Sequence, residues 1–290
     1  MLEQPEQFHA PRHVAVLGCG DLGSRLADLL PQHWQFTGLR REPAALPEGL
    51  QGLSVDYTRP GGLSSLERLA PDYLVTTLKP LGRGPAGYRA GFVTATENLL
   101  GGLGAHRPAA ILMISSTRVY AEHRGGWIDE RSALDTDDPA AAAIVAAEQQ
   151  LLDSPHRAAV LRCAGIYGGA DSRLLSRIAG GEVCAAQPVH FSNRIHRDDV
   201  AGFLLHLIQG VERGVEPELH YTCVDDAPVP QYDVERWLAQ QLGTEPQTQR
   251  TPGERHKRCS NRALTASGYR LLYPDFRSGY GALLASRSNP

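Results

Sequence analysis

The sequence predicts an α/β fold in which helices cover both faces of a doubly wound parallel sheet. Between residues 12 and 166, short apolar runs that suit buried strands alternate with amphipathic stretches that suit helices. The first strand and helix are joined by a glycine-rich turn with the pattern GxGxxG. Placed near the N-terminus between strand and helix, this turn is typical of a Rossmann-type dinucleotide-binding fold.

The glycine turn lies in residues 13–30, HVAVLGCGDLGSRLADLL. Gly18 permits the sharp turn, Gly20 lets a pyrophosphate approach the main chain, and Gly23 lets the helix pack close to the strand. The free N–H groups and the dipole of the helix favour a phosphate. We therefore predict a dinucleotide site; the alternative is a turn kept for packing alone. The predicted cofactor contacts of the turn are Gly18, Cys19, Gly20, Asp21, Leu22 and Gly23.

A pair of arginines follows the second predicted strand, residues 34–39. An acidic residue at this distance beyond the glycines would bind the ribose 2′-hydroxyl of NAD. Arg40 and Arg41 stand there instead, and a guanidinium suits the 2′-phosphate of NADP. The sequence therefore favours NADP over NAD, with a solvated charge pair in a loop as the alternative.

Further polar residues end the next predicted strands, 52–58, 71–77 and 109–116, with a helix over 88–103. Asp56 is placed where it could meet the amino group of adenine. Ligands of parallel sheets bind at the carboxyl ends of the strands, so these residues share one edge with the glycine turn. The predicted cofactor contacts at the strand ends are Arg40, Arg41, Asp56, Thr76, Thr77 and Ser115.

Composition argues against several other classes of protein. The net charge of −3 and pI of about 6.4 do not suggest a nucleic-acid or membrane partner. No apolar stretch is long enough to span a membrane, and residues 1–12 lack the apolar core of a signal peptide, so we expect a cytoplasmic protein. The five cysteines are scattered without a CxxC or Cys/His cluster, so we expect buried thiols and no metal site.

At this point the chain resembles a known family. Its ordered landmarks, which cover nearly the whole chain, are similar to those of the extended short-chain dehydrogenases/reductases, the NAD-dependent epimerase/dehydratase-like proteins. Residues 256–264 and 268–280 are closer still to an atypical bacterial subgroup often described as sugar-nucleotide epimerases by similarity. The landmarks are the glycine turn, YRAGFVTATENLL (88–100), ISSTRVY (114–120), VLRCAGIYG (160–168) and NRIHRDDVA (193–201).

The resemblance implies a catalytic Ser or Thr, a Tyr that transfers a proton and a Lys four residues later. Ser116 stands at the serine position and would orient the substrate. In the helix expected over residues 137–154, Ala140 stands at the tyrosine position and Ile144 at the lysine position. The chain contains no YxxxK, and neither alanine nor isoleucine can transfer a proton.

Four other residues could carry the proton, each with a structural alternative. Tyr120 lies beside the strand of Ser116, but a tyrosine there mostly packs, and Tyr167 follows the sixth strand. His123 lies in a glycine-containing loop, where the favoured interpretation is an exposed histidine without a role in catalysis. His196 has a suitable pKa, but its neighbours favour a hydrogen-bonded structural network.

The alternation of strands and helices ends after Gly168, where the family builds a small substrate lobe from later segments. The expected division is a dinucleotide-binding core over 12–166, a lobe insertion over 167–194, a returning helix and strand over 195–225, and the lobe itself over 226–290. The arginine-rich residues 250–277 would suit a phosphate or a carboxylate, or form ion pairs in a solvated loop.

The expected function is NAD(P)-linked oxidoreduction or epimerisation of a small polar or nucleotide-sugar-type substrate. Because Ala140 and Ile144 replace the family's Tyr and Lys, a non-catalytic NADP-binding sensor or regulatory protein is the alternative. A third reading places a different ligand in the cofactor site. The helices near residues 92–103 and 140–152 resemble the pair that joins dimers in relatives, so we favour a homodimer.

Overall fold

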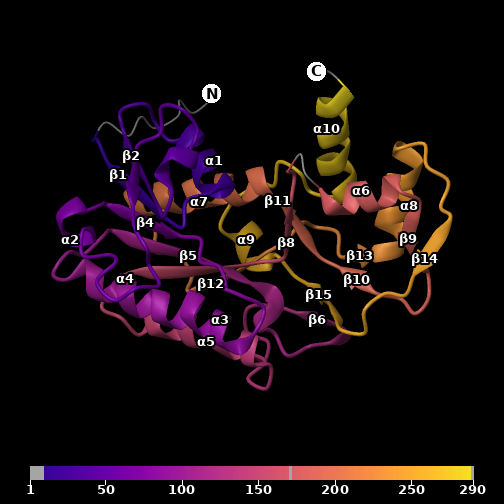
Figure 1. Cartoon of the computed structure of the whole chain (residues 1–290), viewed down its shortest axis with the longest axis horizontal. Helices are drawn as coiled ribbons and strands as arrows, with labels where there is room; N and C mark the ends of the chain where they lie inside the picture. Colours follow the sequence, from indigo (N-terminus) through magenta and orange to yellow (C-terminus); the bar gives the residue numbers. More distant parts are fainter. Residues whose placement is uncertain (1–9, 170–171, 289–290) are drawn as a thin grey trace. The chain divides into compact units, whose positions relative to one another are not determined.

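The computed structural model describes residues 10–169 and 172–288, and its central element is a seven-stranded sheet (Figure 1). The strand order is β12-β7-β5-β4-β1-β2-β3, and the pairs β1–β2, β1–β4, β2–β3 and β4–β5 are parallel. The predicted doubly wound α/β class is therefore confirmed. The strands are β1 (His13–Leu17), β2 (Gln35–Arg40), β3 (Gly52–Ser54), β4 (Tyr73–Thr76), β5 (Ala110–Ser116), β7 (Ala158–Cys163) and β12 (His220–Cys223).

The strand order reverses between β1 and β4, which are neighbours in the sheet although two strands separate them in sequence. In a doubly wound sheet, a ligand binds outside the carboxyl ends of the strands at this reversal. The glycine turn follows β1, and Thr76 ends β4. The topology therefore places the predicted cofactor residues where this fold class binds nucleotides.

Helices α3, α4 and α5 lie together on one side of the sheet strands, and α1 and α7 lie on the other (Figure 1). Their bounds, with that of α2, are α1 (Asp21–Leu29), α2 (Leu66–Leu69), α3 (Pro85–Tyr88), α4 (Ala95–Leu103), α5 (Pro139–Leu152) and α7 (Arg197–Glu212).

The chain is helical over residues 88–103 as predicted, but the first half of this helix is not an α-helix. Arg89–Thr94 form a π-helix, η2, between α3 and α4. A Cβ atom at Gly91 would lie 2.0 Å from the carbonyl oxygen of Lys79, so the main chain there is pressed against the loop after β4. The wider turn follows from this tertiary contact, which helical periodicity cannot reveal.

The strand predicted over residues 52–58 is also shorter than expected. β3 ends at Ser54, and Asp56 begins a turn in which its carboxylate accepts hydrogen bonds from the N–H (3.1 Å) and hydroxyl (2.6 Å) of Thr58. An aspartate that bonds its own main chain two residues on favours a turn over a strand. Asp56 therefore lies in a turn beyond the strand.

The chain divides into two compact units made of interleaved segments. The first runs to Ser115 and adds Asp138–Leu161 and Ala201–Leu219; the second comprises Ser116–Asp137, Arg162–Val200 and the chain from His220. Elements of the second unit are the 3-10 turn η3 (Thr117–Val119), β6 (Arg124–Ile128), β8 (Gly165–Tyr167), α6 (Arg173–Ala179), β9 (Glu182–Cys184), β10 (Phe191–Ser192), β11 (Arg194–His196), β13 (Val229–Pro230), α8 (Gln231–Gln241), β14 (Thr248–Arg250), β15 (His256–Cys259), α9 (Arg262–Ala266) and α10 (Phe276–Ser288).

The second unit has a hydrophobic core of its own, built around α6, α8, β9 and α10. This core explains why the region after Gly168 folds although its strands are only two to four residues long. The buried members are Leu175, Ile178, Val183, Val234, Leu238, Ala239, Phe276, Tyr280 and Leu283.

The remaining expectations about whole-chain properties are met only in part. All five cysteines are free and buried, as predicted. Among the described residues, none of the helices has the length and hydropathy needed to cross a membrane. The same part of the chain holds no group of three metal-binding side chains. Most of residues 1–12, whose sequence lacks a signal core, lies outside the described residues.

Candidate functional site

Contacts within the protein require glycine at two positions of the glycine turn, whereas a third position has free space around it. Gly18 has a φ of +78°, and a Cβ atom on it would lie 2.7 Å from the carbonyl oxygen of Thr77. A Cβ atom on Gly23 would lie 2.6 Å from Sγ of Cys19. At Gly20 the nearest atom would be 3.9 Å away, so the protein's own packing does not require a glycine there.

Gly20 is also the N-cap of α1, and no side chain caps this end of the helix. Asp21, in the first turn, is paired with Arg25 at 3.3 Å, which offsets its negative charge. An uncapped helix N-terminus that begins with an accessible glycine suits a phosphate group. The residues present therefore fit a dinucleotide pyrophosphate.

Thr76 and Thr77 have different roles at the end of β4. The Thr77 hydroxyl donates a 2.8 Å hydrogen bond to the carbonyl oxygen of Gly18, and its N–H donates to Leu17 at 2.8 Å. Thr77 therefore fixes the glycine turn against β4. Thr76 is buried at 1% exposure, and its hydroxyl has no hydrogen-bond partner among the described residues.

Arg40 ends β2, and Arg41 follows it in exposed chain. Within the described residues, no carboxylate forms an ion pair with either guanidinium. Asp56, in contrast, is paired with Arg59 at 3.1 Å, and its hydrogen bond from Thr58 lowers the pKa of the Asp56 carboxyl. The two arginines thus keep their charge available at the carboxyl end of β2.

Ser115 and Ser116 point in different directions at the end of β5, as neighbours on a strand do. The buried Ser115 hydroxyl donates a short hydrogen bond to the buried carboxylate of Glu148 on α5. Ser116 is half-buried, and its hydroxyl oxygen accepts the N–H of Arg118 at 3.1 Å. Ser116 is therefore the more accessible of the two hydroxyls.

The helix that should carry the family's Tyr and Lys is α5. Asp138 caps it by accepting the N–H of Ala140 at 2.9 Å, and both Ala140 and Ile144 are buried. Glu148, one turn beyond Ile144, is the ionisable side chain on this buried face. Positions 140, 144 and 148 are four residues apart, so the sequence already indicates that Glu148 shares a helix face with Ala140 and Ile144. The hydrogen bond that Glu148 accepts from Ser115 is visible only in the structure.

The two tyrosines named as proton carriers are both enclosed. Tyr120 is fully buried and shares a 2.7 Å hydrogen bond with the hydroxyl of Thr222. The ring of Tyr167 stacks on Tyr280 at 4.4 Å, and its buried hydroxyl has no partner among the described residues. Burial raises the pKa of both phenols, so both remain protonated at neutral pH.

The two histidines also have structural partners. His196 is buried, its ring packs 4.1 Å from that of Tyr273, and its Nδ1 accepts the N–H of Asp198 at 3.2 Å. Nε2 of His123 lies 2.9 Å from the carboxylate of Asp135. These contacts resemble the structural network that the sequence offered as the alternative for His196.

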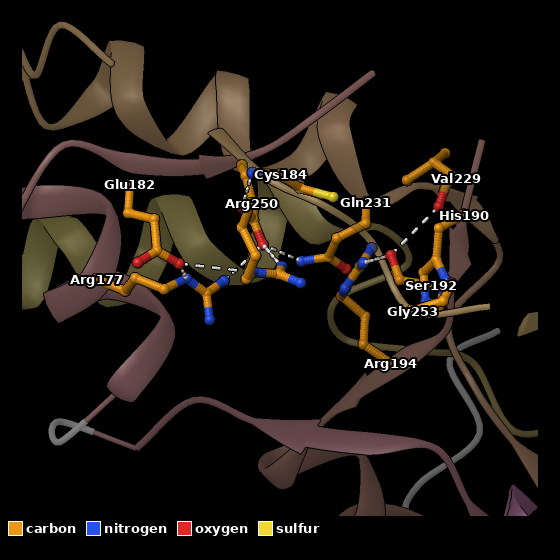
Figure 2. Close-up of polar contacts among 11 residues, drawn as sticks. Arg177, Glu182, Cys184, His190, Ser192, Arg194, Val229, Gln231, Arg250 and Gly253 are labelled. Carbon is orange, nitrogen blue, oxygen red and sulfur yellow. Dashed lines mark hydrogen bonds and ion pairs between the residues drawn. The ribbon is translucent and has the colours of Figure 1, made fainter. Parts of the chain in front are cut away.

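The arginines of the second unit are partly neutralised by carboxylates (Figure 2). Glu235 is fully buried and accepts hydrogen bonds from Arg177 at 2.6 Å and Arg250 at 3.2 Å. Glu182 lies 3.4 and 3.6 Å from Nε of the same two arginines. Arg250, in the arginine-rich residues 250–277, therefore forms the ion pairs that the sequence left as one of two alternatives.

Lys257 lies within the arginine-rich residues 250–277. Its side chain reaches the turn after Ser116. Its ammonium donates to the carbonyl oxygens of Tyr120 at 2.9 Å and Thr117 at 3.2 Å. These contacts join residues 140 and 137 positions apart, so no local pattern could have shown them.

No protein-family model matches the chain. A solved structure from Methylobacillus flagellatus, provisionally described as an NAD-dependent epimerase/dehydratase, is 35% identical with a TM-score of 0.83, over 97% of this chain and 100% of that one. Protein YeeZ of Escherichia coli is 27% identical over 285 residues, 91% of this chain and 97% of that protein.

Two more distant structures share the fold. A human epimerase family protein, solved with NADPH, is 17% identical with a TM-score of 0.74, over 96% of this chain and 100% of that one. The Bordetella bronchiseptica enzyme WbmG, solved with NAD, is 17% identical with a TM-score of 0.80, over 98% of this chain and 96% of that one.

Proposed function

Because the chain belongs to the NAD-dependent epimerase/dehydratase family of extended short-chain dehydrogenases/reductases, we propose that it binds NADP and acts on a small polar or nucleotide-sugar-type substrate. The reaction class is oxidoreduction or epimerisation. The bound nicotinamide would supply hydride transfer, and the protein's residues would bind and orient both molecules.

The open space at Gly20 is the observation that carries this proposal. Gly18 and Gly23 are required by contacts inside the protein, whereas a Cβ atom at Gly20 would meet nothing closer than 3.9 Å. A glycine that the fold does not require, at an uncapped helix N-terminus, is explained by a ligand phosphate. Relatives of the same fold were solved with NAD or NADPH, which supports a nicotinamide dinucleotide.

The preference for NADP rests on Arg40 and Arg41. Each guanidinium lacks an ion-pair partner in the described part of the chain, and a planar guanidinium binds phosphate oxygens through two parallel hydrogen bonds. Burying an adenosine 2′-phosphate beside them would satisfy these donors. NAD offers only a hydroxyl at this position and would leave the charges unused.

Ser116 is proposed to orient the substrate oxygen, since its hydroxyl is half-buried while that of Ser115 is engaged by Glu148. Neither Tyr120 nor Tyr167 is well placed to pass on a proton. Each phenol is enclosed, and burial raises its pKa above the ordinary value near 10. The proposal therefore assigns substrate orientation to Ser116 and gives the tyrosines packing roles.

A second candidate function is a non-catalytic NADP sensor. Ala140 and Ile144 favour it, because both are buried apolar residues at the positions of the family's proton-transferring pair. Sensor and enzyme share the cofactor site and differ in turnover. Incubation with NADPH and a panel of carbonyl compounds and sugar nucleotides separates them: conversion of any substrate supports the enzyme, and cofactor binding without conversion supports the sensor.

Titration with NADPH and NADH, followed by nicotinamide fluorescence, tests the cofactor proposal. We expect NADPH to bind more tightly than NADH, and the double variant Arg40→Ala, Arg41→Ala to weaken NADPH binding about 10- to 100-fold, since 1.4 kcal/mol is tenfold. Arg213→Ala, at an exposed arginine of the same unit, is the matched control and should change neither affinity. Absence of binding by both nucleotides would overturn the proposal.

A further inference from the structure

Lysine is scarce in this chain. Of its 29 basic lysine and arginine residues, only Lys79 and Lys257 are lysines. Lys79 is exposed in the loop after β4, whereas Lys257 is half-buried in β15. Lys257 thus places a compact, strongly hydrated ammonium at a partly buried position, where its desolvation is costly.

Lys257 lies opposite a bulge in the neighbouring strand. β15 pairs in parallel with β6, and between the pairs His256–Arg124 and Arg258–Trp127 the extra residue belongs to β6. The side chain of Asn193 donates to the carbonyl oxygen of Lys257 at 2.9 Å and accepts the N–H of Cys259 at 2.8 Å. Asn193 therefore holds the main chain of β15 in place from Lys257 to Cys259.

The Lys257 ammonium holds the turn that follows Ser116. It donates to the carbonyl oxygens of Thr117, the first residue of η3, and Tyr120, the C-cap of η3. The Ser116 hydroxyl stabilises the same turn by accepting the N–H of Arg118 at 3.1 Å. Lys257 and Ser116 are thus both half-buried groups attached to one turn of the second unit.

The positive charge of Lys257 has no carboxylate partner in the described residues. The nearby Asp135 is engaged by Arg255 at 2.6 Å and His123 at 2.9 Å, and Glu122 accepts main-chain N–H groups. Burial, with Arg255 adding to it, lowers the pKa of the Lys257 ammonium, while Asp135 and Glu122 raise it. An ammonium has three N–H donors, and the two carbonyl oxygens use two of them.

We propose that Lys257 is the cationic anchor of the substrate end of the site, and that its third N–H binds a carboxylate or phosphate oxygen of the molecule oriented by Ser116. This inference rests on the proposed function and deepens it, because it assigns a negative charge to the bound molecule. Lys257 is at the same time a positioning residue for the turn that carries Ser116. The family's lysine position, Ile144, belongs to the first unit.

The two lysines allow a direct measurement on the full chain. Protein labelled with ¹³C-lysine gives two side-chain signals, and a Lys79→Arg variant identifies that of Lys257. We expect the Lys257 signal to titrate below the ordinary range of a lysine and to shift saturably with inorganic phosphate and with acetate. The probe that shifts it at lower concentration identifies phosphate or carboxylate as the preferred group. A Lys257 signal that neither anion shifts would overturn the proposal.

Two variants separate the charge from the fold. Lys257→Met should abolish the phosphate-dependent shifts of the Thr117 and Arg118 amides, and Lys257→Arg should retain them within about tenfold in affinity, because the cation is kept. Lys79→Met is the matched control and should leave the shifts unchanged. Should Lys257→Met fail to fold, Lys257→Arg and the wild-type lysine signal still decide the outcome.

The titrations are repeated with saturating NADPH. NADPH binding with an unresponsive Lys257 would overturn this inference and leave the cofactor proposal standing. A responsive Lys257 in a protein that binds neither NADPH nor NADH would overturn the cofactor proposal and leave an anion site beside Ser116.

Discussion

A Cβ atom on Gly279 would lie 1.9 Å from the hydroxyl oxygen of Tyr167, so helix α10 closes directly over this phenol. The hydroxyl is buried without a hydrogen-bond partner among the described residues, and the ring is stacked on Tyr280. A buried hydroxyl that forms no hydrogen bond destabilises the folded state. These contacts are those of a side chain that packs in the core, and we therefore assign Tyr167 a packing role.

Tyr167→Phe is therefore expected to leave stability unchanged or to raise it by up to about 1 kcal/mol, because the variant removes an unpaired polar atom. Tyr120→Phe is the contrasting variant: it breaks the hydrogen bond to Thr222 and should cost about 1 kcal/mol or more. Urea denaturation measures both. If Tyr167→Phe were the more destabilised of the two, its hydroxyl would have a partner and the assignment would be wrong.

The three glycines of the turn should respond differently to alanine. Gly23→Ala forces a methyl group into Cys19 and Val16 and should cost about 1–3 kcal/mol of stability. Gly20→Ala meets no protein atom, so it should cost less than about 1 kcal/mol, as for an N-cap, yet weaken NADPH binding at least tenfold. Denaturation and NADPH titration of both variants check this. Equal NADPH affinity of wild type and Gly20→Ala would contradict the assigned role.

The two carboxylates that contact Arg177 and Arg250 should differ in importance. Glu235 is fully buried, and Glu235→Gln leaves two guanidiniums without their buried partner; we expect a loss near the lower end of roughly 3–5 kcal/mol, because both arginines are partly exposed. Glu182→Gln is the matched control at a 40% exposed side chain and should cost under about 1 kcal/mol. Similar losses in the two variants, measured by urea denaturation, would show that burial does not set the difference.

Asp225 should make stability depend on pH near neutrality. Burial raises the pKa of its carboxyl to about 7, against an attraction from Arg194 that lowers it. An unfolded aspartate titrates near pH 4, so between about pH 4 and 7 the folded state holds a proton that the unfolded state lacks. Stability therefore falls as pH rises through this window, by up to roughly 4 kcal/mol, and levels off above it.

Asp225→Asn should remove this part of the pH dependence, because the amide does not ionise and its oxygen can still accept the N–H of Ala227. Asp233→Asn, at an exposed carboxylate of the same unit, is the matched control and should keep it. Free energies of unfolding at pH 5 and pH 8 measure the difference. If the free energy of unfolding changed by the same amount between pH 5 and pH 8 in wild type and in Asp225→Asn, the buried carboxyl would not be the source of the pH dependence.

The sequence was sufficient where burial alone decides structure. The strand predicted over residues 109–116 is β5, Ala110–Ser116, and the returning helix and strand predicted over 195–225 contain α7, Arg197–Glu212, and β12, His220–Cys223. Long apolar runs and amphipathic spacing are consequences of core packing, so they can be read from neighbouring residues. The steric demands on Gly18 and Gly23 likewise follow from the GxGxxG pattern.

What the sequence could not show depends on contacts between distant segments. The π-helix at Arg89–Thr94 arises because Gly91 meets the chain at Lys79, and the engagement of Ser115 by Glu148 joins β5 to α5. The hydrogen bond from Lys257 to Thr117 spans 140 positions. Each of these concerns the candidate site more than the fold, which is why the fold was predictable and the chemistry was not.

The interleaving of the two units has a consequence for biosynthesis. All segments of the first unit have been made once Leu219 leaves the ribosome, whereas the second unit still needs the chain from His220 onward. Asp199 is an example from the second unit. Its carboxylate accepts the N–H groups of Leu272 and Tyr273, which are translated 73 and 74 residues later, so these hydrogen bonds cannot form before then. During synthesis the glycine turn can therefore form first, and Ser116 acquires its final surroundings last.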